Sequence, residues 1–293
     1  MDGYAGQVPP GHYYSPIPSL ADIQKRRAEI FSKHTDLKGI DLNTREQVEL
    51  LTAFARLKED VPFYAETRRI RFNIDNGAFS YDDAPVLHYM LRHLKPERVI
   101  EIGSGHSSAC MLDTSELYFS RKIKFTFIDI DCFHLRSNLR EGDAATLTMI
   151  EQPVQAVDMA VFRELQPGDL LFIDSSHVVK TGSDLTTILF EILPALPPGV
   201  CVHFHDIRYP FEYHEGAVMA GIFWNEAYFL RAFLQYNDSF KITFWLNYLV
   251  NASMPEINER LRLLPLDAWA RRFNHGVMDF SGAGGSIYLT KIK

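Results

Sequence analysis

The sequence predicts an α/β fold, in which a mainly parallel sheet of seven strands has helices on both faces. Two observations lead to this prediction. From Arg98 onward, short apolar runs alternate with stretches of helical periodicity, a pattern typical of parallel sheets covered by helices. The first apolar run also ends in two glycines, Gly103 and Gly105, where a strand turns directly into a helix. The 293 residues are enough for one main domain with additions.

Residues 1–72 predict an N-terminal arm followed by a helical extension. Gly and Pro recur throughout the first twenty residues, which favours an extended arm, and helical character begins at Ala21 and lasts to Phe31. Thr44 and Gln47 have the spacing of a capping box. We expect this region to serve as a lid or as an oligomer contact, and residues 73–293 to form the main domain.

The main domain opens with a helix that Asp83 is expected to cap and that ends before Pro96. The apolar runs that follow are the predicted strands: Arg98 to Ile102, Lys124 to Asp129, Thr146 to Ile150, Asp169 to Asp174, Val200 to His205, Lys241 to Leu246 and Ser286 to Lys291. The intervening helices are expected to start near Ser107, Phe133, Met159, Gly182 and Asn225. We expect the last strand to be antiparallel at the sheet edge, after a helical insertion at residues 255–273.

Composition and charge narrow the classes of function. With 46% hydrophobic and 23% charged residues, the chain has the composition of a globular enzyme. Its net charge of -7 argues against nucleic acid and anionic membranes as partners. The three cysteines are isolated, and neither a signal peptide nor a membrane-spanning run is evident. We therefore expect a cytoplasmic protein that acts on a small molecule, and a homo-oligomer is compatible with these numbers.

The turn after the first strand carries the most informative motif, which runs from Glu101 to Ser108. A dinucleotide-binding loop prefers a third glycine at position 108, where this chain has Ser, and Glu101 suits a cationic ligand better than a phosphate. The second strand ends in Asp129, where a carboxylate can accept hydrogen bonds from the hydroxyls of a ribose. Asp131 is the alternative residue for binding the ribose, although it could instead cap the helix that follows. Together these signals indicate a nucleoside cofactor, without deciding between methyl and hydride transfer.

These motifs, together with the run Leu171 to His177, resemble the class I S-adenosylmethionine-dependent methyltransferases, which have a Rossmann-like sheet. The resemblance spans about Asn73 to Lys293 and is greatest to the macrocin O-methyltransferase-like branch, which modifies small molecules and glycans. It implies S-adenosylmethionine as the cofactor and Asp129 as the residue that holds its ribose, and it places residues 155–158 beside the adenine. The implied cofactor-binding residues are Glu101, Gly103, Ser104, Gly105, Ser107, Asp129, Gln155 and Asp174.

A polar cluster follows the fourth and fifth predicted strands, whose carboxyl ends open on the same crevice as the glycine turn. It contains Asp174, His177, His205 and Asp206. His177 or His205 could act as general base for O-methylation, with Asp174 beside them. Metal-dependent relatives place carboxylates at the same strand ends, so the resemblance also implies a divalent metal such as Mg²⁺ on Asp174, His205 and Asp206. The simpler alternative is that Asp174 and His177 cap the following helix and bind each other, without a role in catalysis.

The acceptor is expected to be a small molecule or a glycan. Aromatic and ionisable groups are dense at residues 208–215 and 223–228, which makes these segments candidates for a wall of the acceptor site. Two other classes of function stay open at this point. One is a nicotinamide-dependent oxidoreductase, and the other is a noncatalytic cofactor-binding protein.

Overall fold

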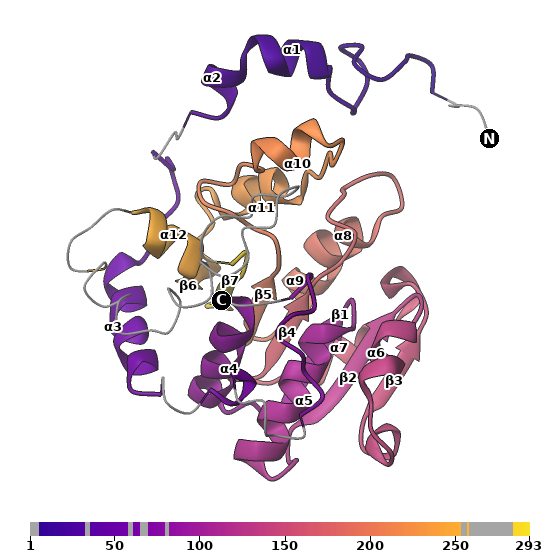
Figure 1. The fold of residues 1–293 in the computed structure, drawn as a ribbon, viewed down its shortest axis with the longest axis vertical. Helices are drawn as coiled ribbons and strands as arrows, with labels where there is room; N and C mark the ends of the chain where they lie inside the picture. The colour runs from indigo at the N-terminus through magenta and orange to yellow at the C-terminus, as the bar shows by residue number, and fades with distance from the viewer. Residues whose placement is uncertain are drawn as a thin grey trace.

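The computed structural model describes residues 6–32, 36–57, 61–64, 70–79, 82–252, 257 and 284–293. It confirms the predicted α/β fold, because a single seven-stranded sheet forms the centre of the molecule and helices surround it (Figure 1). The strands are β1 (Arg98–Ile102), β2 (Lys124–Asp129), β3 (Thr148–Glu151), β4 (Leu170–Ile173), β5 (Cys201–Phe204), β6 (Phe240–Trp245) and β7 (Ile287–Lys291).

The sheet has the strand order β3-β2-β1-β4-β5-β7-β6. Strands β1 to β5 pair in parallel, and β7 pairs antiparallel with both β5 and β6. The last strand, β7, is antiparallel, as predicted. It does not lie at the sheet edge, however, because it is inserted between β5 and β6, and β6 forms the edge. β1 and β2 have the predicted bounds, and every other strand end lies within two residues of its predicted position.

Helices lie before the first strand and between the strands. They are α1 (Leu20–Lys25), α2 (Arg27–Ile30), α3 (Thr44–Ala55), α4 (Asp83–Leu94), α5 (His106–Phe119), α6 (Phe133–Asn138), α7 (Met159–Arg163), α8 (Asp184–Thr187), α9 (Leu193–Ala195), α10 (Glu215–Met219), α11 (Glu226–Leu234) and α12 (Leu246–Asn251). Short turns of helix lie at Pro62–Tyr64, Asp143–Ala145 and Val154–Ala156, and a π-helical turn at Ile188–Ile192 joins α8 to α9.

The order of the strands explains why both faces are covered. From β1 the chain passes through α5 to β2 on one side, whereas from β4 it passes through α8 and α9 to β5 on the other. Since parallel crossovers are right-handed, connections that run in opposite directions place their helices on opposite faces. The central strand β4 is fully buried along its length as a result. Such a strand reads as a continuous apolar run, which is why it could be predicted.

Two predicted helix caps are wrong, for the same physical reason. Asn43, in a left-handed conformation, is the N-cap of α3, and the Gln47 side chain accepts a hydrogen bond from the Trp245 backbone N–H at 2.7 Å. Asp83 lies inside α4, and its carboxylate accepts hydrogen bonds from the backbone N–H groups of Gly285 and Ser286, both at 3.0 Å. Both side chains tie helices to the distant β6 and β7 region instead of capping their own helices.

The N-terminal region is more broken than predicted. Two short helices, α1 and α2, replace the single helix expected to reach Phe31, and turns closed by a hydrogen bond from Gly11 N–H to Ile17 O precede them. The two helices lie beside α10 and α11 (Figure 1). Most of the insertion predicted at residues 255–273 lies outside the described residues. Within the described ranges, none of the helices is long and apolar enough to cross a membrane.

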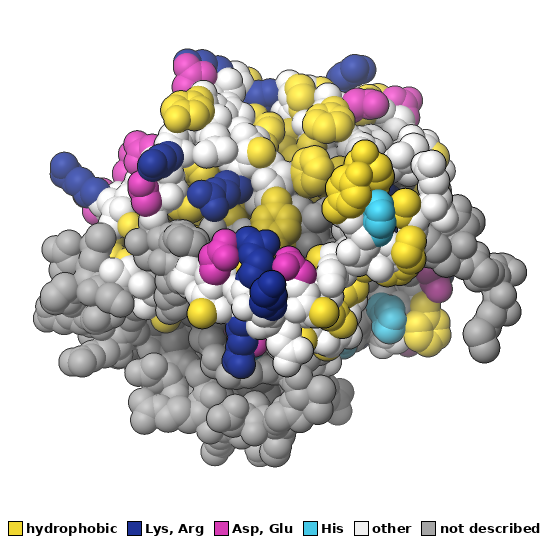
Figure 2. Space-filling view, turned by 90° about the horizontal axis from the view of Figure 1, so that it is seen from above, with side chains coloured by type: hydrophobic (Ala, Val, Ile, Leu, Met, Phe, Trp, Pro, Cys, Tyr) yellow, Lys and Arg dark blue, Asp and Glu magenta, His cyan; other side chains and the backbone are white. Residues whose placement is uncertain are grey.

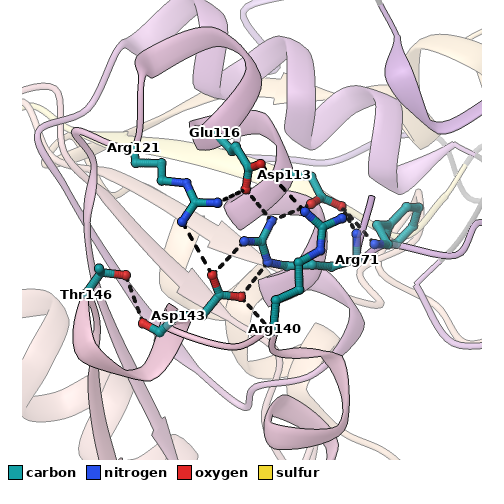
Figure 3. A network of polar contacts seen from close by, with 8 residues as sticks. Arg71, Asp113, Glu116, Arg121, Arg140, Asp143 and Thr146 are labelled. Carbon is teal, nitrogen blue, oxygen red and sulfur yellow. Dashed lines mark hydrogen bonds and ion pairs between the residues drawn. The ribbon is translucent and has the colours of Figure 1, made fainter. Parts of the chain in front are cut away.

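A buried arginine fixes the segment that leads into the main domain (Figure 3). The Arg71 side chain is only 2% exposed, and its guanidinium contacts Asp113 at 2.7 Å, Asp143 at 2.6 Å and Glu116 at 2.9 Å. Asp113 also accepts hydrogen bonds from the backbone N–H groups of Arg71 and Phe72, at 2.7 and 2.8 Å. One cation therefore joins residues 70–72 to α5 and to the turn at Asp143–Ala145.

We expect Arg71→Met to lower the free energy of unfolding by about 3–5 kcal/mol, because Asp113 and Asp143 would remain buried without their cation. The loss should be smaller at pH 5 than at pH 8, since an unpaired buried carboxylate can take up a proton. Urea unfolding at both pH values measures it. Arg45→Met, which removes an exposed pair with Glu49, is the control and should cost less than about 0.5 kcal/mol. Similar losses in the two variants would contradict this role for Arg71.

Candidate functional site

The carboxyl ends of β1 and β4 lie side by side at the centre of the sheet, where the strand order reverses direction. Ile102 of β1 pairs with Ile173 of β4, and the Asp174 backbone N–H donates to Ile102 O at 2.9 Å. Open α/β sheets bind their ligands in the crevice outside such a reversal. The predicted glycine turn and the predicted polar cluster therefore meet at one edge of the sheet.

Gly103 allows the two loops to approach each other. Its φ of +83° lies in the left-handed region, and a Cβ at this position would stand 1.7 Å from the carbonyl oxygen of Asp174. Its N–H donates to Ile128 O of β2 at 2.9 Å. A glycine is thus required here by the contact between two backbones, whereas the sequence suggested close approach to a ligand.

Glu101 is fully buried beneath the turn. Its two carboxylate oxygens accept hydrogen bonds from the hydroxyls of Ser107 and Ser108. Burial raises the pKa of Glu101 to about 8, although the two hydroxyls oppose this effect. The Ser108 hydroxyl in turn accepts a hydrogen bond from the Gly105 N–H at 2.9 Å, which explains why serine replaces the glycine of a dinucleotide-binding loop. Glu101 therefore holds the turn from below.

Asp129 lies beside the same turn and remains partly exposed. One carboxylate oxygen accepts hydrogen bonds from the Ser104 backbone N–H at 2.7 Å and from its hydroxyl at 3.2 Å. The other accepts from the Asp131 N–H at 3.2 Å. The acid at the end of β2 and the turn after β1 are consequently fixed to each other, and the structure brings Glu101, Gly103, Ser104, Gly105, Ser107 and Asp129 together.

Gln155 takes a different position from the other predicted cofactor residues. Its exposed side chain donates a hydrogen bond to Gly182 O at 2.8 Å, so that it links the loop after β3 to the loop after β4. Asp158 caps α7 by accepting from the Ala160 N–H at 2.9 Å. Gln155 and Asp158 thus follow β3 at the carboxyl end of the sheet, and these two hydrogen bonds do not involve the glycine turn.

His177 is the centre of the polar cluster. Its Nδ1 lies 2.7 Å from Oε2 of Glu226, and its Nε2 lies 3.3 Å from Oδ1 of Asp174 and 3.8 Å from Oδ2 of Asp206. The carbonyl oxygen of His177 also accepts hydrogen bonds from the backbone N–H groups of Asn225 and Glu226, at 3.1 and 3.2 Å. One residue thus joins the ends of β4 and β5 to the start of α11.

The carboxylates around His177 decide its charge. Burial alone lowers the pKa of the imidazole, but the hydrogen bonds to Asp174 and Glu226 outweigh burial and raise the pKa to about 10. Burial likewise raises the pKa of Asp174, yet the nearby His205 and His177 lower it to about 2. At neutral pH the pair is therefore an imidazolium and a carboxylate.

His205 has looser contacts than His177. Its Nε2 lies 3.9 Å from Oδ1 of Asp206, and its buried Nδ1 has no hydrogen-bond partner among the residues that the structure describes. Burial lowers its pKa, but the charges of Asp174, Asp206 and Asp83 outweigh burial and raise the pKa above the ordinary value. The ring of Phe79, from the segment that Arg71 anchors, lies 5.2 Å away. His205 is thus the histidine of the cluster whose nitrogens are least engaged.

Sequence reasoning missed two members of the cluster, Glu226 and Asp83. The notable signal in each case is a carboxylate on the apolar face of a helix. Glu226 precedes the buried Leu230 and Leu234 at four-residue spacing, and Asp83 stands four residues before the buried Leu87. An acid on such a face is buried with the leucines and therefore needs a partner.

The predicted metal ligands do not converge on one point. Among the described residues, no group of three or more His, Cys, Asp and Glu side chains is arranged to hold a metal ion. Asp174 and Asp206 instead share the Nε2 of His177, which lies within 4 Å of both. A protonated imidazole thus provides positive charge between the two carboxylates.

Comparisons with known proteins found the following similarities. Residues 100–207 match a family model described as a methyltransferase domain. An uncharacterised protein from Archaeoglobus fulgidus is 33% identical over 173 residues, which are 57% of this chain and 77% of that protein. Among solved structures, the S-adenosylhomocysteine-bound methyltransferase PaMTH1 from Podospora anserina aligns over 95% of this chain and 99% of its own, with 15% identity and a TM-score of 0.44. A putative O-methyltransferase from Klebsiella pneumoniae aligns over 94% and 97%, with 15% identity and a TM-score of 0.36.

We expect Gly103→Ala to lower the free energy of unfolding by about 3 kcal/mol, because the new methyl group would overlap the carbonyl oxygen of Asp174. Gly168→Ala is the matched control. Its φ of +92° is also left-handed, but its Cβ would meet nothing within 4 Å, so backbone strain alone should cost about 1 kcal/mol. Chemical denaturation measures both variants. Equal losses would show that the approach of the two loops is not tight.

Proposed function

The chain belongs to the class I S-adenosylmethionine-dependent methyltransferases, and we propose that it methylates an oxygen of a small-molecule or glycan acceptor. The family resolves the choice between methyl and hydride transfer in favour of methyl transfer. The contact of Gly103 with the Asp174 carbonyl supports this choice of site, because it brings the glycine turn directly beside the polar cluster. A methyl group held at the turn would then face the histidines.

The strand-end crevice suits S-adenosylmethionine. Gly103, Gly105, Asp129 and Asp174 are partly exposed along it. In our proposal Asp129 accepts hydrogen bonds from the ribose hydroxyls, and residues 155–158 border the adenine. Ser104, Gly105 and Asp174 surround the amino acid end, while Glu101 supports the turn through Ser107. When bound, the cofactor supplies an electrophilic methyl group on a cationic sulfur.

The two histidines have different roles in this proposal. Both ring nitrogens of His177 lie within reach of carboxylates. In this proposal both nitrogens carry protons, so neither accepts one. We assign His177 as a fixed cation whose positive charge lowers the pKa of the acceptor hydroxyl. The proton then passes to Nε2 of His205, where Asp206 stabilises the new imidazolium. With the cofactor bound, the acceptor oxygen would take the methyl group, and the electron pair of the broken carbon–sulfur bond would stay on the sulfur.

Metal assistance is the competing proposal. In that case Asp174, His205 and Asp206 would bind Mg²⁺ together with the acceptor oxygens, and the side chain of His177 would have to leave the two carboxylates. Activity that disappears with EDTA and returns with Mg²⁺ would favour the metal. Activity that resists EDTA would favour the histidines.

The N-terminal arm and extension, residues 1–72, remain a proposed unit apart from the main domain at residues 73–293. Within it, α3 packs against β6, because Asn43 donates to Ile242 O at 3.3 Å and Gln47 binds Trp245. Because α3 is part of the packed main body, only α1, α2 and the turns before them remain as the proposed lid or oligomer contact.

We expect Asp129→Ala to weaken S-adenosylhomocysteine binding about 30-fold, which corresponds to about 2 kcal/mol for lost charged hydrogen bonds. Calorimetric titration of the purified protein measures it, and circular dichroism checks the fold. Asp131→Ala, two residues further on and exposed, is the control and should bind as wild type does. If both variants bind equally well, the ribose is held elsewhere. Titration with NAD should give no binding.

We expect His205→Ala to reduce kcat by about 10²-fold or more, the usual scale for a lost general base, with little change in S-adenosylhomocysteine affinity. Methyl transfer from radiolabelled S-adenosylmethionine, with the first acceptor that supports turnover, measures it. His134→Ala, an exposed histidine on α6, should keep full activity. Full activity in His205→Ala and in His177→Ala would mean that the cluster is structural.

A further inference from the structure

A cavity of about 350 Å³ lies between the N-terminal helices and the α10–α11 region. Helices α1 and α2 supply one wall through Ile23, Ile30 and the adjoining Phe31, and Trp224 and Tyr228 stand on the opposite wall. Figure 2 looks onto this end of the molecule and shows hydrophobic side chains gathered among charged ones. The volume is at the lower end of the range for small-molecule sites.

The cavity lies next to the polar cluster through one shared residue. Trp224 lines the cavity, and its ring centroid lies 4.3 Å from that of His177. The residues after it, Asn225 and Glu226, hold the His177 carbonyl with their backbone N–H groups. A molecule in the cavity is thus in contact with the aromatic ring that packs against the imidazole of the polar cluster.

The polar groups of the wall limit what the cavity can bind. Glu212 accepts hydrogen bonds from the Tyr213 N–H and the Tyr228 hydroxyl, and Asn225 exchanges two hydrogen bonds with the backbone of Val179. Few groups are left for the many hydroxyls of a sugar, and the Glu212 carboxylate would repel an anion. The aromatic walls instead favour stacking with a flat ring.

An ion pair connects the two walls. Arg27 of α2 contacts the carboxylate of Glu215 at the start of α10. The Arg27 side chain is 67% exposed, and that of Glu215 is 28% exposed. A contact of this kind contributes little to stability, so the N-terminal wall can separate to admit a ligand.

We propose that this cavity binds the body of the methyl acceptor, an uncharged hydroxylated aromatic compound, and that α1 and α2 determine its specificity. The inference rests on the proposed function for the identity of the ligand as an acceptor. It selects an aromatic acceptor over a glycan, and it assigns residues 16–31 a binding role besides that of a lid.

The test uses the full-length protein and 2-naphthol as the probe, with S-adenosylhomocysteine titrated separately. Calorimetry should detect 2-naphthol binding to the wild type, and 2-naphthoate and methyl glucoside should bind at least 10-fold more weakly. Ile30→Trp, which fills the cavity, should weaken 2-naphthol binding at least 10-fold. Phe31→Ala, which removes an aromatic wall, should also weaken it. The control is Leu20→Trp, which adds the same ring to an exposed position of α1.

All three variants should bind S-adenosylhomocysteine as wild type does. The inference is overturned if the wild type does not bind 2-naphthol, if Ile30→Trp and Phe31→Ala bind it as wild type does, or if methyl glucoside binds more tightly. Failure of the proposed function looks different: 2-naphthol would bind in the cavity while S-adenosylhomocysteine bound nowhere.

Discussion

The site depends on one imidazole ring held by acids from three elements. Asp174 follows β4, Asp206 follows β5 and Glu226 begins α11, and His177 contacts all three. Leaving the buried carboxylate of Glu226 unpaired would be costly, so its contact with His177 helps to fix the start of α11. That start in turn places Trp224 against His177 and gives the proposed acceptor cavity its inner wall. Removing the ring would therefore disturb both the charge of the crevice and its shape.

The backbone brings these acids close together at two tight contacts. Gly103 lets the turn after β1 lie against the carbonyl of Asp174, and Gly285 lets the chain before β7 lie against Asp206, where a Cβ would stand 2.8 Å from the Asp206 Cα. Asp206 and His177 themselves adopt left-handed conformations, with φ of 56° and 58°. Non-glycine residues rarely adopt this conformation, and they keep it only where the surrounding contacts require it. The strain thus lies in the loops of the site rather than in the sheet.

The strands and the strand-end residues could be predicted from the sequence, whereas their long-range partners could not. Buried parallel strands are continuous apolar runs, and the carboxyl ends of parallel strands share one edge, so the proximity of Asp174 to Asp206 follows from local patterns. Asp83 and Gln47 look like helix caps because the cap pattern is local, but their partners lie about 200 residues away, at Ser286 and Trp245. Glu226 shares an apolar helix face with Leu230, and this pattern predicts that Glu226 is buried. It does not predict that His177 is the partner of Glu226.

We propose that His177 is a cation at the pH of the reaction, so that His205 is left to take the proton. Nitrogen-15 NMR of the imidazole rings at pH 7.5, with S-adenosylhomocysteine bound and with His177→Gln to assign the signals, tests this directly. We expect both nitrogens of His177 to have the chemical shifts of protonated imidazolium and to keep them up to about pH 9, because the pKa of the ring is raised to about 10. A neutral ring at pH 7.5, with one protonated and one bare nitrogen, would contradict it and would make His177 itself available as the base.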